Sequence, residues 1–287
     1  MTTSTANWLD VDGERIYFES IGEGDPVVLC HGLGGNHAAW WRVVPGLIGH
    51  HRVITWDQRG FGNSTRRTGR YGPEVAVGDL GALLDHLGLS TVQLIGQSMG
   101  GWVAMGYALR YPERLRSLVL TDTLAGVFTD EIFAEVSRTS SDVLARAMAG
   151  GVDDHPALGQ RFCAEHPDLA FLYREISSMG DKPDEKEVFG MLGGMRAPLD
   201  AVDAMALPVL FVVGEDDQLC PPDAMRHIAG RIPGATLKVL AGAGHSPYFE
   251  VPELWLEAVG PFLGAHAAVH QGGAEPTMEG QGFDPPA

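Results

Sequence analysis

The chain is poor in cysteine and in basic side chains. Three of its 287 residues are cysteines, and Lys and Arg number 20 against 37 Asp and Glu, which gives a net charge of -17. The scattered Cys30, Cys163 and Cys220 match neither a disulfide framework nor a zinc site, so we expect reduced thiols that pack in the interior. So acidic a chain repels nucleic acid, and small neutral or ester-type substrates suit its field better than polyanions.

Targeting and cofactor patterns are also missing. No apolar run approaches the roughly 20 residues of a membrane span, and the first segment, MTTSTANWLDVDG, lacks the basic and apolar regions of a secretory signal. The sequence contains neither a phosphate-binding loop ending in Gly-Lys-Ser/Thr nor a Gly-x-Gly-x-x-Gly at a strand end. We therefore expect a cytoplasmic protein that acts on a small molecule, without cofactor, metal, membrane or nucleic acid, and with a homodimer left open.

What the chain does contain is an alternation of strand-like and helix-like segments. Helical patterns cover 73–88, 99–112, 222–234 and 252–264, and an Asp-Gly turn signal within 8–22 predicts a hairpin that starts the sheet. The alternation predicts an α/β fold with a doubly wound, mostly parallel sheet. Six apolar runs have the length and continuity of strands buried on both faces: 26–32, 51–57, 91–98, 115–122, 208–215 and 235–244.

The strand signals vanish between residues 123 and 206. This stretch is helical in pattern and predicts a cap inserted into a core formed by 8–122 and 207–264. Residues 265–287 are rich in Gly, Pro, Ala and Glu and have almost no bulky apolar side chain. Such a segment cannot bury enough surface to offset its ordering entropy, so we expect it to be disordered.

The segment GQSMG, residues 96–100, places a serine between two glycines, after a predicted buried strand and before a predicted helix. So sharp a turn pushes its tip residue toward strained backbone angles, and the residues two before and two after the tip lie too close for a β-carbon. Gly96 and Gly100 meet that requirement, and Gly101 lets the helix approach the sheet. A simple helix cap would need no such glycines, so Ser98 is predicted to be an exposed nucleophile.

A serine nucleophile needs a base, and the base needs an orienting acid. His245 lies in the glycine-rich segment after the last predicted strand and is the best placed of the eleven histidines, whereas His155, His166 and His227 are expected at the surface. The segment GEDDQLCPP, residues 214–222, offers Asp217 as the acid, with its neighbour Asp216 pointing elsewhere. The rival is Asp122, which ends the preceding predicted strand and could reach the same imidazole.

Two main-chain N–H groups must converge on the oxygen that becomes negatively charged. One is expected from Met99, directly after the nucleophile, and the other from Leu33 in the HGLGGN loop, where His31 is expected to brace the chain.

Substrate contacts are expected from apolar residues near this loop and in the cap. Trp40 and Trp41 lie just past the loop, and packing explains them equally well. The cap offers a further apolar set that suits either a substrate pocket or, more favourably, packing of cap on core: Phe128, Phe133, Phe162, Phe171, Met179 and Met191.

Taken together, HGLGG, DQRGFGNS, GQSMGG, GEDDQLCPP and GAGHSPYFEVPE resemble the α/β-hydrolase superfamily over 8–264, and specifically its esterase and lactonase-like members with a helical cap. In that family Gly-x-x-Asp-x-x-x-Pro marks the acid, which Gly214, Asp217 and Pro221 match. The resemblance implies a serine hydrolase that cleaves an ester or lactone bond of a small, mostly apolar substrate through an acyl-enzyme. It also implies that the polar residues of DQRGFGNS, 57–64, are structural.

Departures from related subsets narrow the chemistry. Haloalkane dehalogenases and epoxide hydrolases carry Asp at the nucleophile position, which is Ser98 here. Carbon–carbon bond hydrolases of ring-cleavage pathways usually carry His-Gly-x-Gly-Pro-Gly and a Trp after the catalytic His, where this chain has Gly35 and Ser246, so that activity is the second candidate. A small-molecule receptor with little turnover and cofactor-free oxygen chemistry on the same scaffold are further alternatives.

Overall fold

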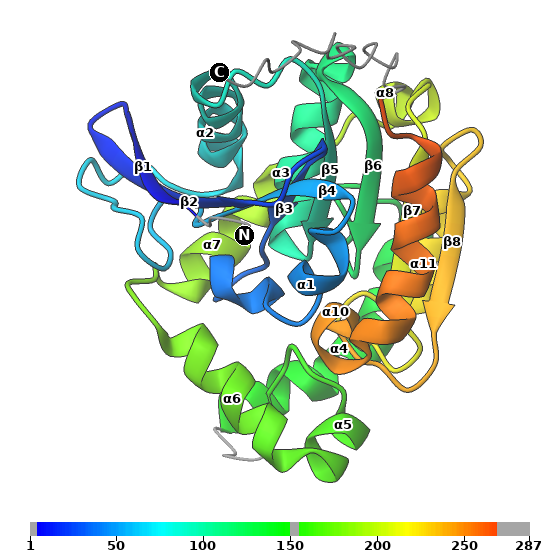
Figure 1. Ribbon diagram of the computed structural model, residues 1–287. Helices are drawn as coiled ribbons and strands as arrows, with labels where there is room; N and C mark the ends of the chain where they lie inside the picture. Colours follow the sequence, from blue (N-terminus) through cyan, green and yellow to red (C-terminus); the bar gives the residue numbers. More distant parts are fainter. Residues whose placement is uncertain (1–4, 150–154, 269–287) are drawn as a thin grey trace, which may run out of the picture.

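The computed structural model describes residues 5–149 and 155–268, so most of the predicted disordered tail lies outside the described residues. At its centre is one eight-stranded sheet (Figure 1) in the order β1-β2-β4-β3-β5-β6-β7-β8. The strand β2 runs antiparallel to both β1 and β4, and the remaining pairs are parallel, which confirms the predicted doubly wound α/β sheet. The strands are β1 (Thr5–Val11), β2 (Glu14–Ile21), β3 (Asp25–Cys30), β4 (His51–Trp56), β5 (Val92–Gln97), β6 (Leu115–Thr121), β7 (Val209–Gly214) and β8 (Thr236–Leu240).

The predicted hairpin forms where β1 meets β2. Asp12 and Gly13 join the two strands with φ angles of 48° and 80°, a backbone that suits a tight two-residue turn.

Helices cover both faces of the sheet, and alternate strand residues point to each face. The helices α2 (Pro73–His86), α3 (Met99–Arg110) and α9 (Pro222–Ala229) share one core cluster with Val209, Phe211 and Val213 of β7. The helices α1 (Val44–Leu47) and α11 (Pro252–Ala265) share the other cluster with Leu210 and Val212. Burial on both faces explains why β7 is a continuous apolar run.

The strand β8 departs from this pattern. The sequence predicted burial on both faces, but Val239 is 42% exposed and only the last residue of the strand, Leu240, is buried. That prediction is wrong because β8 is the edge strand, paired with β7 on one side and open on the other.

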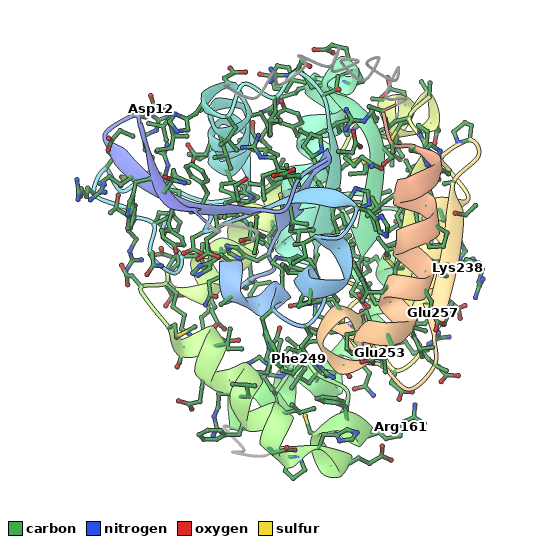
Figure 2. The ribbon with its side chains drawn as sticks, viewed as in Figure 1. Asp12, Arg161, Lys238, Phe249, Glu253 and Glu257 are labelled. Carbon is green, nitrogen blue, oxygen red and sulfur yellow. The ribbon has the colours of Figure 1, made fainter. Side chains whose placement is uncertain are left out.

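Between β6 and β7 the described residues of 123–206, which are 123–149 and 155–206, form a helical insertion. Phe249 lies at its junction with the rest of the molecule (Figure 2). The insertion contains α4 (Asp130–Ala149), α5 (Gln160–Glu165), α6 (Pro167–Ser178), α7 (Glu185–Gly194) and α8 (Leu199–Asp203). The remaining short helices are η1 (His37–Trp40), η2 (Pro112–Arg114) and α10 (Pro247–Glu250).

Among the described helices, none combines the length and apolar content that crossing a lipid bilayer demands.

Candidate active site

Ser98 occupies a sharp turn between β5 and α3. Its φ of 49° and ψ of -120° are strained for a residue with a β-carbon. A β-carbon on Gly96 would lie 2.5 Å from the carbonyl oxygen of Gly100, and one on Gly100 would lie 2.1 Å from that of Cys30. A β-carbon on Gly101 would lie 2.2 Å from Thr123 Oγ1, so all three glycines have the steric reason that the sequence suggested.

The structure brings Ser98, His245 and Asp217 into one chain of hydrogen bonds. Ser98 Oγ lies 3.0 Å from His245 Nε2, and His245 Nδ1 lies 2.9 Å from Asp217 Oδ2. The three residues follow β5, β8 and β7, so they meet at the carboxyl edge of the sheet. His245 and Asp217 are buried, whereas Ser98 is partly accessible.

Asp217, rather than Asp122, contacts the imidazole. The second oxygen of Asp217 accepts the amides of Leu219 and Cys220 at 2.9 and 3.0 Å. Burial alone would raise the pKa of Asp217, but His245 and these amides outweigh it and hold that pKa below its usual value.

Asp122 is fully buried beside Asp217. Its carboxyl oxygens accept the Gly214 amide at 2.9 Å and the Thr121 hydroxyl at 2.7 Å. Burial and the neighbouring Asp217 carboxylate hold the pKa of Asp122 well above its usual value. The rival acid therefore braces the end of β7.

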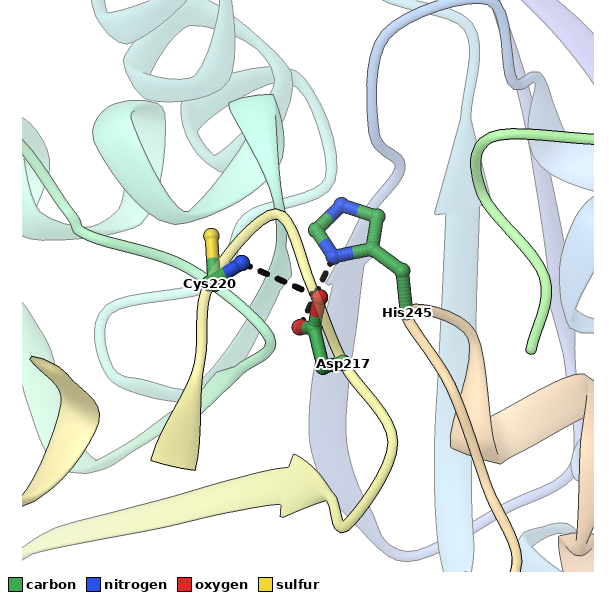
Figure 3. A group of neighbouring side chains, drawn as sticks. All are labelled: Asp217, Cys220 and His245. Atoms are coloured by element: carbon green, nitrogen blue, oxygen red, sulfur yellow. Dashed lines mark hydrogen bonds and ion pairs between the residues drawn. The ribbon is translucent and has the colours of Figure 1, made fainter. Parts of the chain in front are cut away.

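Within the described residues, one group of three side chains has the composition of a metal site: Asp217, Cys220 and His245 (Figure 3). Their donor atoms lie within 4.8 Å of one another. His245 Nδ1 is already hydrogen-bonded to Asp217, and burial raises the pKa of the Cys220 thiol well above its usual value. Because a thiol binds metal as the thiolate, the group fits an oriented imidazole better than an ion.

The HGLGGN loop forms a tight turn opposite Ser98. The Gly35 amide donates to the Gly32 carbonyl at 3.1 Å, and Gly34 has a φ of 72°, which favours glycine. A β-carbon on Gly32 would lie 3.1 Å from the Ser98 β-carbon, so the loop runs close to the hydroxyl. Within the described part of the chain, the Leu33 and Met99 amides donate no hydrogen bond.

His31 braces this loop, as expected. Its Nδ1 donates to the Gly32 carbonyl at 2.8 Å, and its Nε2 accepts the Gln58 amide at 3.0 Å. Burial lowers the pKa of His31 and keeps the ring neutral, which both contacts require.

The DQRGFGNS turn that supplies Gln58 is held by its own polar side chains. Asp57 accepts the His37 and Asn63 amides at 2.6 and 2.7 Å, and the buried Arg59 pairs with Asp79. These residues are structural, as the resemblance implied.

The loop that carries His245 is fixed by two residues that sequence reasoning did not single out. Gln97, the neighbour of Ser98, donates through Nε2 to the His245 carbonyl at 2.9 Å. Glu250 accepts the amides of Gly244 and Ser246, which flank His245, at 2.8 and 2.9 Å. A lone carboxylate in the apolar segment SPYFEVP was the signal available in the sequence.

His155 is not the surface residue that the sequence suggested. It is partly buried in the insertion, and its ring centroid lies 5.0 Å from that of Tyr173. Burial, with Lys182, Arg174 and His245 adding positive charge, lowers the pKa of His155 to about 4. This imidazole is therefore neutral at physiological pH.

The four predicted substrate contacts lie in different surroundings. Trp40 has no exposed surface and packs on Tyr248 with ring centroids 4.4 Å apart, so the packing alternative holds for it. Trp41 is 45% exposed, Met179 is 48% exposed, and Phe128 is partly buried beside Trp102. Substrate contact by these three residues stays a prediction.

The wider apolar set of the insertion is also divided. Only Phe162 is buried, whereas Phe133, Phe171 and Met191 are 68%, 55% and 37% exposed. The expectation that the whole set packs the insertion on the core is wrong.

Comparisons with known proteins agree with this geometry. The family model described as alpha/beta hydrolase fold matches residues 25–167 and 166–252. A 2-hydroxy-6-oxo-2,4-heptadienoate hydrolase of Pseudomonas putida is 33% identical over 270 residues, 88% of this chain and 94% of that protein.

Two solved structures are similar over most of the chain. An esterase from Thermogutta terrifontis has a TM-score of 0.75 and 29% identity, covering 93% of this chain and 100% of that one. Est816, described as an N-acyl homoserine lactone degrading enzyme, has a TM-score of 0.72 and 26% identity, covering 89% and 100%. The chain thus belongs to the α/β-hydrolase fold family and is a hydrolytic enzyme.

Proposed function

We propose that this hydrolase cleaves an ester or lactone bond of a small, mostly apolar substrate, with Ser98 as nucleophile, His245 as general base and Asp217 as the orienting acid. The main support for this proposal is the continuous hydrogen-bonded chain through His245. Its Nε2 lies 3.0 Å from Ser98 Oγ, and its Nδ1 lies 2.9 Å from Asp217 Oδ2. The similarity to an esterase and to a lactone-degrading enzyme supports this substrate class.

The reaction begins when His245 Nε2 takes the proton of Ser98 as Oγ attacks the carbonyl carbon. The new C–O bond gives a tetrahedral oxyanion, and His245 then returns the proton to the leaving alcohol oxygen as the old C–O bond breaks. Water, deprotonated by the same imidazole, attacks the acyl-enzyme and releases the carboxylic acid and free Ser98. Asp217 stabilises the imidazolium in both steps.

The oxyanion is held by the main-chain N–H groups of Met99 and Leu33. The amides are unengaged within the described residues, and Met99 opens α3, so its amide belongs to the positive end of that helix. The helical insertion acts as the cap that encloses the acyl group.

Ser98→Ala tests this function with p-nitrophenyl butyrate as the ester. Loss of the nucleophile is expected to lower kcat on the order of a millionfold, while the exposed Ser90→Ala variant keeps wild-type activity. Retention of most ester hydrolysis by Ser98→Ala would show that the serine is not the nucleophile.

Hydrolysis of a carbon–carbon bond is the second candidate, favoured by the 33% identity to the Pseudomonas putida hydrolase, whose named substrate contains no ester. Purified protein assayed on matched esters, lactones and vinylogous diketones separates the two. A higher kcat/KM on the diketones than on every ester and lactone would replace the first proposal with the second.

A further inference from the structure

Glu250 sits where the His245 loop meets the helical insertion. It is 5% exposed, and its carboxylate accepts three main-chain N–H groups. The Gly244 and Ser246 amides, on either side of His245, donate at 2.8 and 2.9 Å. The third donor is the amide of Gly159 at 3.0 Å, from the residue that precedes α5 in the insertion.

The two segments that Glu250 joins are in backbone contact. A β-carbon on Gly244 would lie 2.2 Å from the Gly159 nitrogen, so the two segments cannot pack any closer together. A second link from the insertion is Tyr173, whose hydroxyl lies 3.0 Å from Ser246 Oγ. The His245 loop is thus fixed by Gln97 from the core and by Glu250 and Tyr173 on the side of the insertion.

We propose that Glu250 is a positioning residue: its carboxylate ties the His245 loop to the insertion and thereby sets the imidazole at Ser98, and protonation of Glu250 releases this tie. The inference rests on the proposed role of His245 as the base. A carboxylate only accepts hydrogen bonds, whereas a carboxylic acid directs its own proton at one of the N–H donors. Because Oε2 accepts two amides and Oε1 accepts one, protonation of either oxygen opposes at least one existing bond.

Several charged or titratable groups of the described residues lie near Glu250. Asp217 and Tyr173 interact with it electrostatically, and His245 lies on the loop that it holds. Arg42 donates to the carbonyl of the neighbouring Phe249, and Arg161, after Gly159, is paired with Asp216. Burial raises the pKa of Glu250 to about 7 although the three amides lower it, so the carboxylate forms only as neutral pH is approached.

The test is the pH dependence of kcat and KM for p-nitrophenyl butyrate, from about pH 5 to about pH 9. In the wild type full activity requires the His245 base to be free of a proton and Glu250 to be a carboxylate, so log kcat/KM falls with a slope steeper than one below about pH 7, until the loss due to Glu250 is complete. Glu250→Gln, which cannot titrate, is expected to fall with a slope of one and to have a kcat at alkaline pH about a hundredfold lower, with KM little changed.

Tyr173→Phe is the matched control. It removes the other link between insertion and loop but leaves the carboxylate, so its profile keeps the region that is steeper than a slope of one. A wild-type profile that is nowhere steeper than a slope of one, or a Glu250→Gln profile that overlays the wild type, overturns the proposal, and the wild-type profile decides even if the variant does not fold. Ser98→Ala distinguishes a failure of the proposed function from a failure of this inference, because the activity of that variant tests the triad independently of Glu250.

Discussion

Gly100→Ala should damage both stability and activity, since the added methyl group meets main chain on two sides. Its carbon would lie 2.1 Å from the Cys30 carbonyl oxygen and 2.7 Å from that of His31, whereas ordinary contact begins at 3.4 Å, a shortfall of 3.4 - 2.1 = 1.3 Å. Neither obstacle is a flexible side chain, so α3 must move away from the end of β3. Overpacking of this kind costs typically 1–3 kcal/mol, and two backbone obstacles place the expected loss of unfolding free energy at about 3 kcal/mol.

The same movement separates the Met99 amide from the Leu33 loop. A misplacement of about 1 Å in a catalytic constellation lowers the rate about a hundredfold, so kcat for ester hydrolysis is expected to fall by that factor. Urea unfolding gives the free energy, and steady-state kinetics give kcat.

Gly78→Ala is the matched control for this substitution. Gly78 also lies within a helix, α2, but a β-carbon there meets nothing within 4 Å. Alanine is favoured over glycine in a helix interior by about 0.5–1 kcal/mol, so this variant should be slightly more stable and fully active. The steric reasoning is refuted if Gly100→Ala unfolds at the wild-type urea concentration and keeps wild-type kcat.

Two further predictions concern carboxylates. Asp217→Asn should lower kcat about ten-thousandfold. Asp122→Asn should keep at least about a tenth of the wild-type kcat, because Asp122 bonds to Gly214 and Thr121 instead of the imidazole. A larger loss in Asp122→Asn than in Asp217→Asn would make Asp122 the acid. Glu250 has a pKa of about 7 in the folded chain against 4.5 as its ordinary value, so its stabilising contribution is complete below pH 4.5 and is lost as the pH rises through about 7. Unfolding free energies of wild type relative to Glu250→Gln should therefore fall by about 3 kcal/mol over that interval, and a constant difference contradicts the raised pKa.

Local patterns in the sequence predicted most of the fold and the position of Ser98 at the turn between β5 and α3. The two glycines at 96 and 100 flank Ser98 within one five-residue motif, so the turn could be read from the sequence, although the obstacle to a β-carbon on Gly100 is the main chain of the distant Cys30. Burial on both faces leaves an uninterrupted apolar run in β7 and a mostly apolar one in β5, which is why both strands were recognised.

What the sequence could not provide depends on contacts between distant segments. The apolar character of 235–244 resembles that of the inner strands, and only the strand order makes β8 an edge. Trp40 and Trp41 are adjacent and chemically identical, yet one is buried and the other is 45% exposed. The Gly159 amide, one of the three donors to the Glu250 carboxylate, belongs to a residue 91 positions away in the sequence.

The strained backbone of Ser98 makes the position of its hydroxyl depend on the residues packed around it. With a φ of 49° and a ψ of -120°, this residue would relax to extended or helical angles if its neighbours allowed it. The contacts of Gly96, Gly100 and Gly101 with the atoms around them oppose that relaxation. Substitutions that loosen the packing of α3 on the sheet would let the Ser98 hydroxyl move away from the His245 imidazole. We therefore expect that changes at positions outside the site can abolish activity while the fold is retained.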